Sequence, residues 1–289
     1  MNTLAMPLTV RRLLVDLDTP LPRHWCGDAF RTAFFNALSM SFPAGEQLFI
    51  DSVRKGMAKL QPDKQVAMAD EVQGFIGQEA THRHIHQRFN EHLNRQGLVN
   101  SWEPRIVARR PLLEGIDTRN WLAVTAATEH LTAIFSEHLL AHPQALQGAQ
   151  PRLRDLWLWH CSEETEHRST AFDLYVALGG NHDWRCRIFK VVTQTFIVDA
   201  LRQTLRNLWH DNSWWRPGTW VDAARFLFGS HGLIRCTRAP WRHYLREDFH
   251  PQQGDGAVAE RWLLQNVALA PPLHPSTRPS TYPSPRPAA

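Results

Sequence analysis

The stretch Trp157-Leu-Trp-His-Cys-Ser-Glu-Glu-Thr-Glu-His167 contains the spacing that decides the fold. His160, Glu164 and His167 are separated by four and three residues, which places them on one face of an α-helix. Apolar residues extend this face on both sides: Leu153, Trp157, Ala171, Leu174 and Leu178. The face is therefore expected to point into a core, where a carboxylate and imidazoles need a partner such as a metal ion.

A second stripe of the same kind contains Glu79 and His82. Residues at positions i and i+3 share a helix face, so this Glu-x-x-His pair directs a carboxylate and an imidazole to one side. The remaining members of the stripe are Val72, Ile76, His86, Phe89 and Leu93. This helix is therefore also expected to place ionisable groups in a core.

Two other segments each add one glutamate to an apolar stripe. Glu46 accompanies Phe49, Ile50, Val53, Met57 and Leu60. Glu129 accompanies Leu122, Ala126, Thr132 and Ala133, whose mostly small side chains leave room for an inward carboxylate. The order along the chain is Glu, Glu-x-x-His, Glu, Glu-x-x-His, which is the ligand order of helical bundles that bind two iron or two manganese ions. Carboxylates and imidazoles suit these metals better than metals that prefer thiolates.

Residues beside the motifs have simpler interpretations. His86 is expected to pack or hydrogen-bond rather than to bind metal, and Glu163 and Glu166 are expected on the surface or behind the ligands. The pair Glu247 and His250 precedes a proline and is interpreted as a helix end. Most of the 12 tryptophans are expected in the core. The C-terminal helices that carry Trp209, Trp214, Trp215 and Trp220 are expected to pack over one face of the bundle, with an oligomer contact or a membrane surface as the alternatives.

Helical periodicity predicts an all-α protein, a ferritin-like four-helix bundle with additional C-terminal helices. Pro43 is expected to break or kink the chain between the first two helices. The expected helices cover residues 25–40, 44–60, 63–96, 118–142, 150–178, 184–211 and 218–247.

The expected organisation has three parts. Residues 1–24 form an N-terminal arm. Residues 25–250 form the ferritin-like domain, with the metal bundle at about 44–178, a crossover at 98–117 and accessory helices at about 184–247. Residues 251–289 form an extension, which is rich in Pro, Ser and Thr and is expected to be disordered from about 268.

Composition excludes several classes of protein. Lys and Arg total 32 against 28 Asp and Glu, and the net charge of +4 is not concentrated in a stripe, so nucleic acid is not an expected partner. No apolar run reaches the length of a transmembrane helix, and the N-terminal segment lacks the apolar region of a signal peptide. The four cysteines are scattered, which predicts neither disulfides nor a thiolate zinc site and favours the cytoplasm.

The chain resembles ferritin-like di-iron proteins, and residues from about 30 to 250 resemble the bacterial family catalogued as predicted metal-dependent hydrolases. Three phrases carry the second resemblance: Ser-Phe-Pro-Ala-Gly-Glu46, Gln-Glu79-Ala-Thr-His82 and Glu163-Glu164-Thr-Glu-His167, with Asp248-Phe-His-Pro near the end. The His-x-x-x-Glu-x-x-His pattern from His160 is similar to that of p-aminobenzoate N-oxygenase, a di-iron enzyme with a third histidine on this helix. Together, the resemblances imply these metal ligands: Glu46, Glu79, His82, Glu129, His160, Glu164 and His167.

The expected function is that of a dinuclear oxidase or oxygenase acting with O₂ on a small organic substrate. Its cofactors would be two iron ions, with manganese as the alternative, and an electron donor would be a partner. One alternative is a metal-dependent hydrolase with a dinuclear site, as the family description implies. Seven ligands including three histidines nearly fill two coordination spheres, which favours the first function. A non-enzymatic helical metal-binding protein is another alternative, and assembly as a homodimer is left open.

Overall fold

The computed structural model describes residues 8–273, and within them the protein is all-α, as the periodicity predicts. One isolated bridge, between Arg11 and Pro272, is the only β pairing in this part of the chain. The helices are α1 (Ala29–Met57), α2 (Pro62–Arg95), α3 (Glu103–Arg109), η1 (Arg110–Leu113), α4 (Thr118–Ala141), η2 (Pro143–Leu146), α5 (Pro151–His167), α6 (Thr170–Ala177), α7 (His182–His210), α8 (Pro217–Phe228), α9 (Leu233–His243), η3 (Pro251–Gln253) and α10 (Ala257–Gln265).

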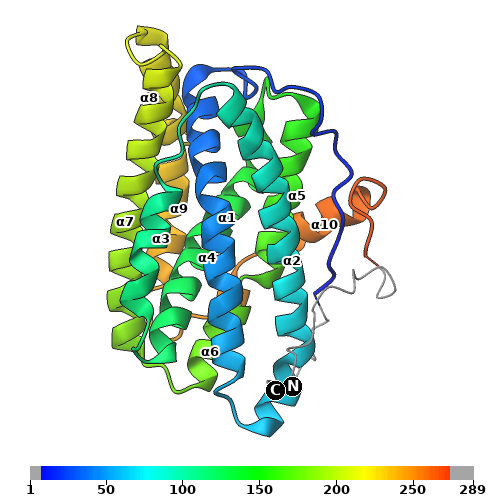
Figure 1. Cartoon of the computed structure of the whole chain (residues 1–289), viewed down its shortest axis with the longest axis vertical. Coiled ribbons are helices and arrows are strands. Elements are labelled where there is room, and N and C mark those ends of the chain that lie inside the picture. Colours follow the sequence, from blue (N-terminus) through cyan, green and yellow to red (C-terminus); the bar gives the residue numbers. More distant parts are fainter. Residues whose placement is uncertain (1–7, 274–289) are drawn as a thin grey trace, which may run out of the picture.

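The central bundle is formed by α1, α2, α4 and the α5–α6 segment (Figure 1). Helix α1 packs against α2 and α4, and α4 packs against α5 and α6. The connection between α2 and α4 is long and includes α3, which contacts α1. This arrangement is compatible with a ferritin-like bundle whose second and third core helices are joined by a crossover.

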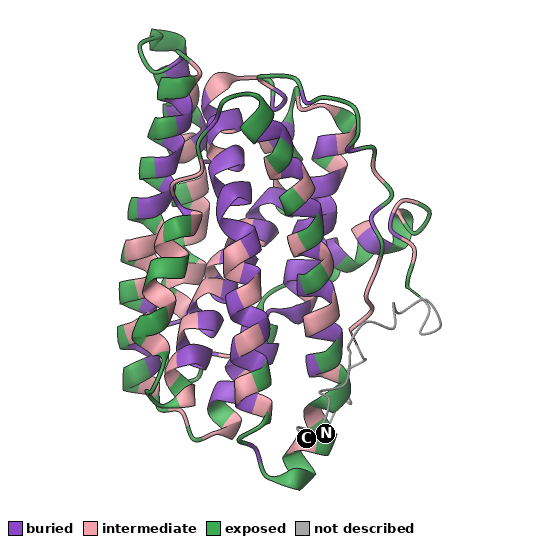
Figure 2. Cartoon of the chain, in the orientation of Figure 1, coloured by how far each residue is buried: buried purple, intermediate pink, exposed green. Residues whose placement is uncertain are grey.

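The remaining helices cover the bundle from two sides. Helix α7 runs along α1 and α4, and α10 packs against α5. Buried residues line the inner helices, whereas α8 and the outer face of α7 are largely exposed (Figure 2). Within residues 8–273, every helix falls short of the length and apolarity needed to cross a membrane.

The expectation of a break at Pro43 is wrong, because α1 continues through this residue. A proline has no N–H to donate, so the carbonyl of Ser39, four residues earlier, loses its helical partner. The side-chain amide of Asn90 on α2 donates to this carbonyl at 2.8 Å. A donor from the neighbouring helix therefore replaces the missing hydrogen bond.

Two expected helices are interrupted. The helix expected at 150–178 divides into α5 and α6 at Arg168 and Ser169, where the Arg168 side chain bonds Glu137 at 2.8 Å and the Gly254 carbonyl at 2.7 Å. The helix expected at 218–247 divides into α8 and α9 at a turn that ends at Gly232. A Cβ on Gly232 would lie 2.6 Å from the Gly229 nitrogen, so the turn requires glycine there.

The chain is ordered beyond residue 268, where disorder was expected. The N–H of Leu14 donates to the Leu269 carbonyl at 2.8 Å, and the N–H of Leu273 donates to the Val10 carbonyl at 2.8 Å. Ala270 is buried between these contacts. Pairing with the N-terminal arm therefore orders residues up to 273, and the rest of the expected disordered segment lies outside the described residues.

Fewer tryptophans are buried than expected. Trp157 and Trp159 lie in the core, as do Trp25, Trp102 and Trp121, but five buried residues are not most of the 12. The accessory helices pack on the bundle, as expected, with α7 against α1 and α4 and α8 against α1. Four tryptophans of this region are nevertheless exposed, by 60% for Trp209, 43% for Trp214, 63% for Trp215 and 43% for Trp220. Apolar spacing alone does not show which helix faces have a neighbour, so these exposed positions were not predicted.

Candidate metal centre

The helices of the central bundle bring all seven predicted ligands into its interior. Helix α1 contributes one residue, α2 two, α4 one and α5 three. None of the seven is more than 2% exposed: Glu46, Glu79, His82, Glu129, His160, Glu164 and His167. The helical spacing therefore predicted correctly which faces are buried.

Six of the seven residues form two groups of three. In the first group, Glu46, His82 and His160 offer ligand atoms that lie within 4.8 Å of one another. The second group consists of Glu79, Glu164 and His167 and meets the same limit. Each group combines carboxylate and imidazole donors, so the bundle holds two adjacent sets of metal-ligating atoms.

Glu164, a member of the second group, also contacts the first group. Its Oε1 is 3.4 Å from Nδ1 of His82 and 3.4 Å from Nε2 of His160, which belong to the first group. Its Oε2 is 3.5 Å from Nε2 of His167 in the second group. A carboxylate in this position can contact ions held by either group.

Glu129 joins the second group from α4. Its Oε2 lies 3.4 Å from Nε2 of His167, and Glu79 Oε1 lies 3.2 Å from the same nitrogen. Small residues on the same face, such as Ala126 and Ala133, allow the carboxylate to turn inward.

The polar atoms of this cluster fit a metal pair, because many of them have no other partner. Both oxygens of Glu46, Glu79 and Glu129 are buried without a hydrogen bond. The same is true of Nδ1 of His82 and Nε2 of His167. Buried polar atoms are almost always satisfied in proteins, and an unpaired one costs roughly 1–3 kcal/mol. Cations bound between these atoms would satisfy them together.

Burial perturbs the protonation of these groups. It raises the pKa of the Glu46 and Glu129 carboxyls well above the usual range, and nearby acids raise both further. Burial also lowers the pKa of His160 to about 3, so its imidazole is neutral at neutral pH. A cation favours carboxylates over carboxylic acids and binds only neutral imidazoles, so metal binding would release protons here.

The outward nitrogens of two histidines are hydrogen-bonded. Nε2 of His82 lies 3.0 Å from Glu163, and Nδ1 of His167 lies 2.9 Å from Oε1 of Gln78. With a metal bound, these contacts would favour the tautomers in which Nδ1 of His82 and Nε2 of His167 direct a lone pair toward the ion. Metal-binding histidines are oriented in this way in general.

Arg11 connects these two contacts. It bonds Glu163 at 3.2 Å and Glu166 at 2.7 Å, and Glu166 accepts a 2.8 Å hydrogen bond from Gln78. The arm before α1 therefore stabilises the residues behind both histidines. Glu163 is completely buried and contacts His82, so of its two expected positions it takes the one behind the candidate ligands and not the one on the surface. The roles of Arg11 and Gln78 were not predicted, because no spacing rule links position 11 to position 163.

His160 has a comparable support. Its Nδ1 lies 3.3 Å from Nε2 of His86, and Nδ1 of His86 lies 2.9 Å from the Ser39 hydroxyl. The Phe42 ring stacks on His160 with centroids 4.7 Å apart. His86 therefore hydrogen-bonds rather than joining the ligand groups, as expected, and it directs Nε2 of His160 toward Glu164.

Aromatic rings separate the cluster from solvent. Trp159 packs edge-on against His82 at 4.9 Å between centroids, and Phe75 packs against His167 at 4.9 Å. Both aromatic side chains are fully buried. Charge interactions inside this apolar layer are stronger than they would be in water.

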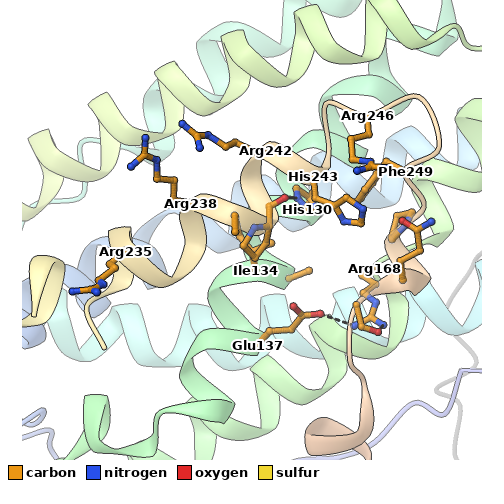
Figure 3. Close-up of a pocket in the computed structure, with 16 residues that line it drawn as sticks. His130, Ile134, Glu137, Arg168, Arg235, Arg238, Arg242, His243, Arg246 and Phe249 are labelled. Atoms are coloured by element: carbon orange, nitrogen blue, oxygen red, sulfur yellow. Dashed lines mark hydrogen bonds and ion pairs between the residues drawn. The ribbon is translucent and has the colours of Figure 1, made fainter. Parts of the chain in front are cut away.

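A cavity of about 850 Å³ opens on the other side of α4 and is lined by none of the seven residues (Figure 3). His130, next to Glu129 in the chain, contributes to its wall, as does Arg168, next to His167. Its charge is strongly positive, because five arginines line it: Arg168, Arg235, Arg238, Arg242 and Arg246. Glu137 is its acidic residue and pairs with Arg168.

The fold and the buried donor groups define an all-helical protein with a candidate dinuclear metal centre. The family described as predicted metal-dependent hydrolase matches residues 9–255, and the chain belongs to this family. No curated protein and no solved structure matches the chain.

Proposed function

We propose that this member of the metal-dependent family is a dinuclear iron oxidase or oxygenase that acts with O₂ on a small organic substrate. The observation that carries the proposal is the buried set of four carboxylates and three imidazoles in two groups joined by Glu164. Two divalent cations would balance the charge of the four carboxylates. Seven protein ligands leave few coordination positions for water, which suits O₂ chemistry better than hydrolysis.

Iron bound here would supply electrons to dioxygen. The chain's own residues would hold the ligand geometry and exclude water. Glu163 and Gln78 orient two imidazoles, and His86 orients the third. Trp159 and Phe75 form part of the apolar layer, through which a small apolar gas passes more readily than a charged species.

We place the substrate's polar group in the arginine-lined cavity, because its charge favours an acidic small molecule. The iron pair would also require an external electron donor. A cytoplasmic location fits four free cysteines. The proposal includes two variants: manganese could occupy the centre in place of iron, and the protein could assemble as a homodimer.

The second candidate is a hydrolase that uses the same centre, which the family description favours. Two metal ions would then activate water and polarise the scissile bond. This function requires a coordination position for water between the ions. The seven candidate protein ligands leave few such positions, which favours the first function.

The test is to load the full chain with ferrous iron without oxygen and then to mix it with O₂. The proposal predicts about two iron ions per chain, O₂ consumption proportional to bound iron, and a transient change in visible absorption. His82→Gln should reduce all three. The matched control is His84→Gln on the same helix, because His84 is exposed and should leave them unchanged. Protein that binds zinc or manganese, does not consume O₂ and cleaves esters or amides would show the hydrolase instead.

A further inference from the structure

A second cluster of metal-ligating side chains lies near the C-terminal end of α4. His138 belongs to the last turn of α4, and His142 follows the end of that helix. Cys236 lies in the first turn of α9, and His231 lies in the turn between α8 and α9. Residues from three segments of the chain therefore meet at this point.

The donor atoms are close enough to share one ion. Ligand atoms of His138, His142 and Cys236 lie within 4.8 Å of one another, and Nε2 of His142 is 3.9 Å from Sγ of Cys236. The His142 ring lies 5.0 Å from the His138 ring and 4.8 Å from the His231 ring, between centroids. His142 is therefore the centre of a group of three imidazoles and one thiol.

Hydrogen bonds from Gln144 and Cys236 account for the two nitrogens of His142, but nothing comparable in the described part of the chain accounts for Nδ1 of His138. Only 6% of His138 is exposed, and its Nδ1 is buried without a hydrogen-bond partner. Among residues 8–273, no carboxylate forms an ion pair with these three imidazoles. An imidazole nitrogen that has no hydrogen-bond partner can bind a metal ion.

We propose that His138, His142 and Cys236 bind a zinc ion, with His231 as the fourth ligand. Imidazole and thiolate are the donors that zinc prefers, and four protein ligands are typical of structural zinc sites. Zinc bond lengths place a tetrahedral nitrogen and sulfur about 3.5 Å apart. The 3.9 Å between His142 and Cys236 is therefore close to the distance that binding requires.

The site is separate from the candidate dinuclear centre. His138 follows Glu129 by nine residues on the same helix, which corresponds to about 13 Å along the axis. The proposed zinc ion joins the end of α4 to the start of α9 and holds the turn between α8 and α9. Its role is therefore structural, and it is independent of the proposed oxidase function.

Cobalt is a probe that distinguishes this site from the dinuclear centre. A thiolate bound to Co²⁺ gives a charge-transfer band in the near ultraviolet, and the dinuclear ligand set contains no cysteine. We expect the full chain to show this band on titration with Co²⁺ and Cys236→Ser to lose it. The matched control is Cys186→Ser, because Cys186 is the other thiol beside an imidazole, 3.3 Å from His182. This control should retain the band.

The histidines are tested by zinc affinity, measured in competition with a chromophoric chelator. Loss of a direct ligand should cost at least as much as loss of a partner behind a ligand, which is about ten- to a hundredfold. Cys236→Ser should therefore weaken the thiolate site about a hundredfold, and His231→Ala should weaken it about tenfold. His231 is exposed, so its removal should not disturb folding, and circular dichroism checks this for each variant. The exposed His210, replaced by Ala, is the control and should leave the affinity unchanged.

Three results would overturn the proposal. The parent protein could lack the cobalt–thiolate band, the band could persist in Cys236→Ser, or it could disappear in Cys186→Ser. Unchanged zinc affinity in His231→Ala would overturn the assignment of the fourth ligand. Retention of the band in a protein that fails to react with O₂ would refute the oxidase function and support the zinc site.

Discussion

In each of the three candidate ligand imidazoles, one ring nitrogen faces the carboxylates and the other contacts a polar side chain. The contacts are His82 with Glu163, His167 with Gln78, and His160 with His86. These partners determine which nitrogen keeps its lone pair, so they contribute to metal affinity without touching the ion.

The first prediction at this scale concerns His160. His160→Ala should retain the fold and iron binding through the other six residues. Iron affinity should fall about tenfold or more, and the absorption change on mixing with O₂ should differ from that of the parent. Iron titration and rapid-mixing absorption measure the two effects.

The control for His160→Ala is His92→Ala. His92 is also buried, and its ring bonds the Leu17 carbonyl at 2.6 Å, away from the ligand groups. This variant should lose stability without a change in iron affinity. If His160→Ala behaves in the same way as His92→Ala, His160 is a packing residue and not a ligand.

The second residue-scale prediction concerns Arg11. Arg11→Ala leaves the buried Glu163 without its cation, so the carboxylate orients His82 less well. We expect iron affinity to fall about tenfold. The exposed neighbour Arg12, replaced by Ala, should have no effect. A lower melting temperature with unchanged iron affinity would show that Arg11 acts on stability alone.

At the scale of elements, local spacing was sufficient to predict which helix faces carry the candidate ligands, but not where α1, α5 and α6 begin and end. A helix face is determined by residues three and four apart, so the buried position of Glu79 or Glu164 could be predicted without knowing the neighbouring helix. Interactions between distant residues could not be predicted in this way. Asn90 supports α1 at Ser39 across 51 positions, and Arg11 bonds Glu163 across 152.

The continuity of α1 gives a prediction of its own. Asn90→Ala leaves the Ser39 carbonyl unpaired, which should lower the free energy of unfolding by about 1–3 kcal/mol. In a Pro43→Ala background the N–H of Ala can donate to that carbonyl, so the same substitution should cost about 1 kcal/mol less. Denaturant unfolding of the two single variants and the double variant measures this coupling. Additive effects would show that Asn90 does not compensate for the proline.

At the scale of the whole molecule, the two terminal segments join in one structure beside the bundle (Figure 1). The arm lies so close to α2 that a Cβ on Gly77 would be 2.4 Å from a methyl group of Val10. Pairing with residues 269–273 holds the arm from its outer side. The arm contains Arg11, so a segment more than 250 positions later in the chain contributes to the residues behind the candidate ligands.

Two truncations test this connection. Ending the chain after residue 267 removes backbone hydrogen bonds from Arg12 to Pro271, Leu14 to Leu269 and Leu273 to Val10, together with the buried Ala270. Three such bonds are worth about 2–4 kcal/mol in total. The melting temperature should therefore fall by roughly 5–10 °C for a chain of this size. Iron affinity should also fall, because Arg11 is no longer held against Glu163.

Ending the chain after Leu273 keeps every one of these contacts and should change neither quantity, since the residues removed are rich in Pro, Ser and Thr. Differential scanning calorimetry and iron titration of the two truncated proteins make the comparison. Equal behaviour of the two would contradict a role for residues 268–273, and a loss of stability in both would place the supporting contacts beyond residue 273.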